Sequence, residues 1–226
     1  MSREKRLREC IGKADICELL LNAFSFPEKT LACALADGSF LNDYLNCLKD
    51  IGTCSTATPT TEDTLKAFEE ENVDELLTAL KQEYSFLYLA PGADKVLVFP
   101  YESAFRYKQD GREGTPTLFR SPTTIDVERQ MQEAGVLPKN ARVEPSDGIA
   151  NEFEFLMYLY AQQASALEQN NLDEEKFWLS KVDLFLVSHF LKWVPLFMEK
   201  TSSYTEFPHY SKLARVALHG VSALVD

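Results

Sequence analysis

The strongest constraint on the fold is a nearly continuous apolar run from Phe153 to Ala161, in which Glu154 is the one charged residue. A helix made of these residues is apolar on almost every side, so other elements have to cover it nearly all round. Its uninterrupted part, 155–161, is far shorter than the roughly 20 apolar residues that a membrane-spanning helix needs. The run therefore predicts a helix at the centre of a folded core and no membrane span.

A second strongly apolar helix is predicted over 173–198, where Pro195 is expected to kink or end it. Apolar residues also recur at helical spacing elsewhere, and Gly52 and Pro208 stand where helices commonly stop and start. No internal repeat and no strand-like alternation long enough for a sheet is present. We predict an all-α fold, a single domain over 1–226, with the two apolar helices at its centre and the others wrapped around them. The other predicted helices are 3–24, 28–36, 40–51, 60–89, one ending near Gly135, and a last one with Pro208 near its first turn.

Three segments interrupt the helical pattern. Residues 53–61 are rich in Ser and Thr, which is typical of a flexible loop. Residues 91–122 hold four Pro and three Gly and indicate an extended excursion or a loop between two helical halves. Thr123-Thr124-x-Asp126 then resembles a capping box for the next helix, and 135–145, with two Pro, forms another loop. Mobility is expected in the first two segments.

The charge balance excludes one class of partner. Thirty-five Asp and Glu residues against 23 Lys and Arg residues give a formal net charge of −12. Such a surface repels the phosphates of nucleic acids and of anionic membranes. Its natural partners are basic, although acidity that merely keeps the protein soluble explains the composition equally well. The dense acidic run from Glu62 to Glu83 is expected to be a solvated helix face.

The five cysteines, Cys10, Cys17, Cys33, Cys47 and Cys54, form no C-x-x-C motif. An odd number without that spacing favours buried free thiols over a disulfide framework or a zinc site, and so indicates a reducing compartment. The first residues are charged and show no export signal. Together these observations predict a cytoplasmic protein.

No familiar catalytic or cofactor motif is present. The sequence lacks a P-loop, a dinucleotide-binding glycine pattern, an H-E-x-x-H pair and a G-x-S-x-G elbow. The three histidines, His189, His209 and His219, are too dispersed for an obvious metal cluster. We therefore predict no metal, no other cofactor and no enzymatic activity. A nucleotide hydrolase or a metal-dependent hydrolase stays open as a minor alternative.

Two polar segments lie next to strongly apolar ones. Pro100-Tyr101-Glu102-Ser103 follows the apolar residues 96–99, and Glu144-Pro145-Ser146-Asp147 leads into the apolar run. Carboxylates at the mouth of an apolar groove can bind guanidinium groups through charge-assisted hydrogen bonds. The simpler alternative is that Asp147 is the N-cap of the apolar helix.

Four stretches in this order make the chain similar to a known family. They are 83–89 (EYSFLYL), 98–103 (VFPYES), 144–147 (EPSD) followed by 151–157 (NEFEFLM), and 185–197 (FLVSHFLKWVPLF). The chain resembles the TorD/DmsD family of cytoplasmic redox-enzyme maturation chaperones over roughly residues 15–220. The resemblance implies an all-helical protein that performs no bond chemistry. It also implies a partner, the twin-arginine signal peptide and apo-form of a molybdopterin-dependent oxidoreductase, whose export is delayed until the cofactor is loaded.

A signal peptide with two arginines and an apolar stretch needs a receptor with carboxylates beside an aromatic groove. His189 lies four residues before Trp193 on the same helix face, so the two side chains are expected to line one groove wall. Ordinary core packing is the alternative for both. The predicted peptide-binding residues are Tyr101, Glu102, Glu144, Asp147, His189 and Trp193.

One position departs from the family pattern, because Gly148 stands where the family normally has a His after the E-P-x-D segment. This departure bears on peptide specificity more than on the fold. The alternative function is a helical protein-interaction scaffold without signal-peptide specificity. The sequence does not select a client enzyme, and it fits either a monomer or a domain-swapped dimer.

Overall fold

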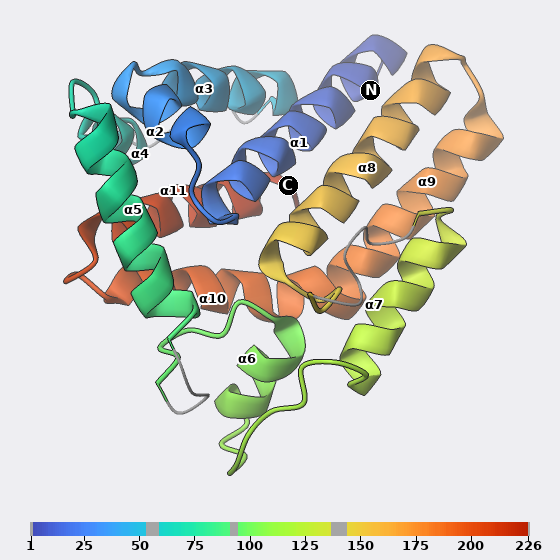
Figure 1. The fold of residues 1–226 in the computed structure, drawn as a ribbon. Helices are drawn as coiled ribbons and strands as arrows, with labels where there is room; N and C mark the ends of the chain where they lie inside the picture. Colours follow the sequence, from blue (N-terminus) through green and yellow to red (C-terminus); the bar gives the residue numbers. More distant parts are fainter. Residues whose placement is uncertain (1, 53–58, 91–94, 137–143, 226) are drawn as a thin grey trace.

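The computed structural model describes residues 2–52, 59–90, 95–136 and 144–225, with only the backbone at 59 and 60. Within these ranges all the regular structure is helical and no strand occurs, which confirms the predicted all-α fold (Figure 1). The helices are α1 (Arg3–Phe24), α2 (Lys29–Ala36), α3 (Ser39–Ile51), α4 (Pro59–Lys66), α5 (Val73–Tyr88), α6 (Glu102–Gln109), α7 (Pro122–Glu133), α8 (Ile149–Glu168), α9 (Leu172–Phe185), the π-helical η1 (Leu186–Phe190), α10 (Leu191–Ser203) and α11 (Pro208–Ala223).

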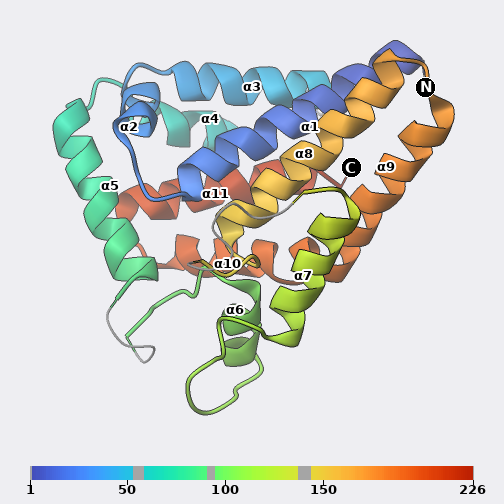
Figure 2. The ribbon, with the colours of Figure 1, turned by 45° about the vertical axis from the view of Figure 1, so that its right-hand side comes forward.

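Helices α1 and α8 form the central antiparallel pair, with α3 packed on α1 and α9 packed on α8 (Figure 2). Helix α8 carries the apolar run, and it is central as predicted. The prediction that 173–198 is the other central helix was correct only for its second half. Helix α9 lies at the edge of the body and exposes several large apolar side chains, whereas α10 is buried among α6, α8 and α11.

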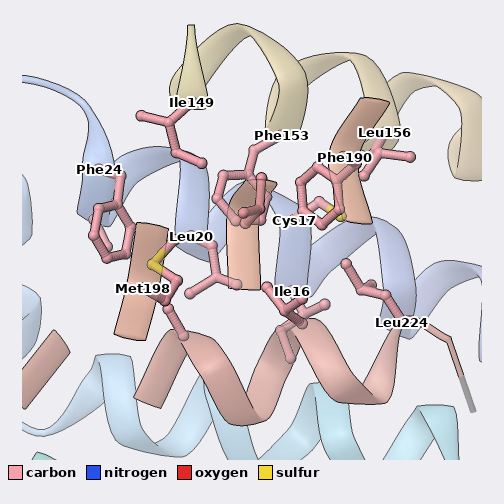
Figure 3. Close-up of a cluster of buried hydrophobic side chains, with 14 of the residues drawn as sticks. Ile16, Cys17, Leu20, Phe24, Ile149, Phe153, Leu156, Phe190, Met198 and Leu224 are labelled. Carbon is pink, nitrogen blue, oxygen red and sulfur yellow. The ribbon is translucent and has the colours of Figure 1, made fainter. Parts of the chain in front are cut away.

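The main core lies where α1, α8 and α10 meet (Figure 3). Ile16 and Leu20 of α1, Phe153 of α8 and Phe190 at the end of η1 are at most 1% exposed. Close packing of α1 on α3 depends on Gly12, because a Cβ there would lie only 2.9 Å from the backbone oxygen of Cys47. Apolar burial of this extent is the main favourable term in folding.

The second predicted apolar helix is one long helical segment with a π turn inside it. Pro195 lies inside α10 and does not end it, since the helix continues to Ser203. The π turn η1 inserts an extra residue before α10, and such turns are common at functional sites. Here it places His189 toward α6 and α7, as described below.

Three local predictions need correction. The predicted helix 60–89 is two helices, because Asn72 caps α5 by accepting from the backbone N–H groups of Asp74 and Glu75. The capping box at 123–126 is wrong, since Ser121 is the N-cap of α7 and Pro122 is its first residue. The excursion 91–122 also contains the helix α6. Its first turn is capped by Asp147, which is distant in sequence.

Burial of the cysteines agrees with the prediction of free thiols. Cys10, Cys17 and Cys47 are buried and Cys33 is half-buried, all as free thiols, while Cys54 lies outside the described residues. Burial raises the pKa of the Cys10 thiol to about 11 and that of Cys47 to about 12, so these thiols are held in their neutral form. The predicted loops at 53–61 and 135–145 also fall largely outside the described residues. Among the helices that the structure describes, none has the length and apolar character needed to cross a bilayer.

Candidate functional site

Two polar segments far apart in the sequence pair side by side. The backbone N–H of Glu102 donates to the oxygen of Asp147 at 2.8 Å, and that of Ile149 donates to Pro100 at 2.9 Å. These bonds make a short antiparallel bridge between Tyr101 and Gly148. The structure therefore brings together the two polar segments singled out in the sequence.

Asp147 fixes this pairing by capping a helix other than its own. Its Oδ2 accepts from the backbone N–H of Ser103 at 2.8 Å, in the first turn of α6, and its Oδ1 accepts from the Thr124 hydroxyl of α7 at 3.1 Å. The N-cap of α8 is Gly148, which has no capping side chain, so the expectation that Asp147 caps its own helix is wrong. Burial raises the pKa of the Asp147 carboxyl, although the hydrogen bonds from Ser103 and Thr124 oppose that shift.

Glu102 is fully buried in α6, and its carboxylate connects this helix to η1. Its Oε1 accepts from Arg106 at 2.7 Å, and its Oε2 lies 2.7 Å from Nδ1 of His189. The other ring nitrogen of His189 lies 2.9 Å from Oδ2 of Asp126 in α7. Both ring nitrogens of His189 therefore face carboxylate oxygens, so the imidazole connects Glu102 of α6 with Asp126 of α7.

Asp126 is the solvent-facing member of this cluster. Its partial burial would by itself raise its pKa, but hydrogen bonds from Arg129, His189 and Gln130 outweigh that effect and hold the pKa down to about 2. The carboxylate is therefore ionised throughout the physiological range. It anchors the outer side of the His189 ring to α7.

Trp193 is fully buried and donates from Nε1 to Oε2 of Glu152 at 3.0 Å. The other carboxyl oxygen of Glu152 is buried and has no hydrogen-bond partner within the described residues. Burial and the nearby carboxylates of Glu102 and Asp147 raise the pKa of Glu152 well above its ordinary value, against the lowering effect of the Trp193 bond. This environment favours the neutral acid.

One part of the site is accessible, and we call it the aromatic–carboxylate surface: Phe26, Tyr84, Tyr101 and Glu144. Glu144 and Phe26 are exposed, and the two tyrosines are half-buried. Phe26 meets Tyr84 edge to face with ring centroids 5.5 Å apart. Burial and the charges of Glu144 and Asp147 raise the pKa of Tyr101 to about 12, and burial, Tyr101 and Glu144 raise that of Tyr84. The surface therefore combines aromatic rings with one exposed carboxylate.

The six predicted site residues therefore separate into two groups. Tyr101 and Glu144 are reachable from solvent, whereas the other four are buried and held by partners inside the protein: Glu102, Asp147, His189 and Trp193. Because His189 and Trp193 are buried, they do not line an accessible groove in this conformation. Whether these residues bind a peptide stays a prediction.

Sequence reasoning missed Glu152 and Asp126 as members of the cluster. The signal for Glu152 was its place directly before the apolar run that starts at Phe153, where a buried carboxyl has to find a partner. Asp126 was interpreted as part of a capping box, and its real partner, His189, is distant in sequence. Within the described ranges, no group of three or more His, Cys, Asp or Glu side chains is arranged to hold a metal ion.

Gly148, the departure from the family pattern, has an ordinary extended backbone with φ −78°. A Cβ at this position would lie 3.4 Å from the Tyr101 ring and 3.4 Å from the Pro145 oxygen. A side chain would therefore rest directly against Tyr101. Because Gly148 has no side chain, position 148 does not cover this side of the Tyr101 ring.

Replacing Glu152 with glutamine is expected to remove part of the pH dependence of stability. Because the pKa of this carboxyl is higher in the folded than in the unfolded chain, the folded state binds more protons above about pH 4.3. The contribution of Glu152 to stability is present below that pH and is lost as the pH rises toward its folded pKa. The stability of Glu152→Gln relative to the original protein should therefore rise between pH 5 and pH 8, measured by urea unfolding.

The matched control for this experiment is Glu154→Gln, which changes an exposed glutamate of the same helix. Its stability relative to the original protein should stay constant over the same pH interval. A relative stability of Glu152→Gln that is flat or falling with pH would contradict the assignment of a buried neutral acid.

Comparison with known proteins assigns the chain to a family. Residues 54–199 match the family model described as nitrate reductase delta subunit, which is more than half of the chain, and the chain belongs to this family. It is also 27% identical over 156 residues to the chaperone protein TorD of Vibrio parahaemolyticus serotype O3:K6 (strain RIMD 2210633). That alignment covers 69% of this chain and 66% of the relative, just under two thirds of its length. No solved structure gives a significant match.

Family membership confirms the resemblance inferred from the sequence motifs. The chain is a member of a chaperone family and not of a catalytic one. The predicted cytoplasmic location is confirmed on the same basis.

Proposed function

We propose that this protein is a chaperone for a molybdopterin-dependent oxidoreductase, that it binds the twin-arginine signal peptide of that client, and that it delays export until the cofactor is inserted. The observation that carries the proposal is the family match over 54–199, which contains all four sequence stretches of the resemblance. One stretch contains Tyr101 and another ends at Asp147, directly before Gly148, so the bridge between Tyr101 and Gly148 brings the two stretches together at the aromatic–carboxylate surface.

The chemistry of that surface supports arginine recognition. A guanidinium group stacks on an aromatic ring and pairs with a carboxylate at the same time, which a Tyr101 ring beside Glu144 permits. The apolar stretch of the peptide would then continue over the exposed ring of Phe26. The net charge of −12 adds a long-range attraction that speeds encounter with a cationic peptide.

The four buried residues act through this surface. Asp147 and Glu102 hold the segments that carry Tyr101 and Glu144, and they are tied in turn to α7 and η1. In this proposal they are positioning residues, and Tyr101 and Glu144 make the contacts with the peptide.

The proposal is tested by calorimetric titration with a synthetic twin-arginine signal peptide, beside a version in which both arginines are replaced with alanine. We expect the first to bind at least tenfold more tightly. Equal binding of both peptides would remove arginine recognition and favour the scaffold alternative. Absence of binding to either peptide would contradict the whole proposal.

Replacing Glu144 with glutamine is expected to weaken binding of the twin-arginine peptide about tenfold, because one charge-assisted hydrogen bond, of about 1.5 kcal/mol or more, is lost. The helical content measured by circular dichroism should not change, since Glu144 is exposed. The control is Glu168→Gln at the other end of α8, roughly 30 Å away, which removes the same charge from another exposed site. Equal weakening by both variants would show that only bulk charge matters.

A further inference from the structure

The segment around α6 and before α7 projects from the helical body (Figure 2). A cavity of about 440 Å³ is lined by residues of this segment. Its volume falls in the range of small-ligand sites. Arginine is unusually frequent in its lining for a chain with a net charge of −12. The cavity is lined by Ser103, Arg106, Tyr107, Asp110, Arg112, Thr117, Arg120, Ser121, Pro122 and Thr123.

The three arginines of the cavity differ in how far they are already paired. Arg106 is tied to the buried Glu102, and Arg112 pairs with Asp110 at 3.2 Å and lies over the Tyr107 ring. The Arg120 side chain makes no ion pair or hydrogen bond with any residue that the structure describes. Two of the three guanidinium groups are therefore paired with a carboxylate, and Arg120 carries the positive charge that is left uncompensated at the cavity.

The other polar groups of the cavity are hydroxyls. The hydroxyl oxygen of Ser103 is buried and has no hydrogen-bond partner among the described residues. Thr117 and Thr123 add two further hydroxyls to the lining. Guanidinium groups that bind oxyanions in a fork geometry, together with hydroxyl donors, form the usual protein environment of a phosphate group.

We propose that this cavity binds a small oxyanion, either free phosphate or the phosphate group of an ester. In the bound state Arg112 and Arg120 hold the oxyanion from the open side, and Ser103 and Arg106 approach it from the side of α6. The acidic surface elsewhere repels such a ligand, so binding depends on this local group of arginines.

The test is calorimetric titration of the full chain with sodium phosphate and, separately, with phenyl phosphate, both at constant ionic strength. We expect saturable binding with one site per chain. Tighter binding of phenyl phosphate would identify an ester as the ligand, since its ring can contact Tyr107, and equal binding would identify the free anion. The double variant Arg112→Gln and Arg120→Gln should lose at least tenfold in affinity while keeping its helical content.

The matched control is the double variant Lys49→Gln and Lys176→Gln, which changes the net charge by the same amount at exposed positions outside the cavity. It should bind phosphate like the original protein. The proposal is overturned if the original chain shows no saturable binding of either compound. It is also overturned if the two double variants lose affinity equally.

Discussion

Replacing Trp193 with alanine is expected to lower the free energy of unfolding by about 4 kcal/mol, as is typical when a buried tryptophan is truncated. The indole is fully buried and packs between the rings of Phe105 and Phe197, with centroids 5.8 and 5.4 Å away. The substitution also removes the hydrogen bond that Glu152 accepts, which leaves a buried carboxyl without that donor. Urea unfolding followed by far-ultraviolet circular dichroism measures the change.

The control for this prediction is Trp193→Phe, which keeps most of the ring volume and removes the N–H donor. The free energy of unfolding should fall clearly less in this variant than in the alanine variant, because a smaller cavity forms. If the two variants lost the same stability, the packing of the indole would not be the main contribution of this residue.

Replacing Glu102 with leucine is expected to lower the free energy of unfolding by about 3 to 5 kcal/mol, the usual cost of removing one partner of a buried charged pair. The change leaves Nδ1 of the buried His189 without its acceptor and releases Arg106 from its carboxylate. It also loosens α6 relative to η1, so twin-arginine peptide binding should fall with stability. Urea unfolding and calorimetry measure the two effects.

A double-mutant cycle separates the pair from its surroundings. The double variant Glu102→Leu and His189→Leu should lose less unfolding free energy than the two single variants lose together. The difference should be about 1 to 3 kcal/mol, because the two groups are in direct contact. The exposed pair Glu62 and Lys66 is the control, since it has the same helical spacing as Glu102 and Arg106. Glu62→Leu should change stability by no more than about 0.5 kcal/mol. Additive losses in the cycle would mean that the Glu102–His189 contact contributes nothing of its own.

The buried cluster and the accessible surface have different physical roles. Burying a charged or polar group such as Glu102 or Glu152 costs desolvation free energy. Only hydrogen-bond or ion-pair partners with good geometry offset this cost. In this chain those partners are supplied by α6, α7, η1 and α10, so the cluster fixes how these elements meet. Tyr101 and Glu144 of the aromatic–carboxylate surface lie on the segments that this cluster holds in place.

The sequence by itself determined most of the helices. The bounds predicted for 3–24 match α1, Gly52 ends α3 with a positive φ, and Pro208 is the first residue of α11. These features were predictable because helical periodicity and the chain-terminating properties of Gly and Pro act over a few neighbouring residues. The apolar run in α8 likewise required a central position, which it has.

Only the tertiary structure decided which carboxylates are buried and which are free. Glu102 and Glu144 are the same residue type in similar polar segments, yet one is fully buried against His189 and the other is exposed. Asp147 looked like the cap of its own helix and instead caps α6. The partners that decide these outcomes lie far away along the chain, so no local pattern contains them. Burial and hydrogen bonding between distant segments are settled only when the helices pack.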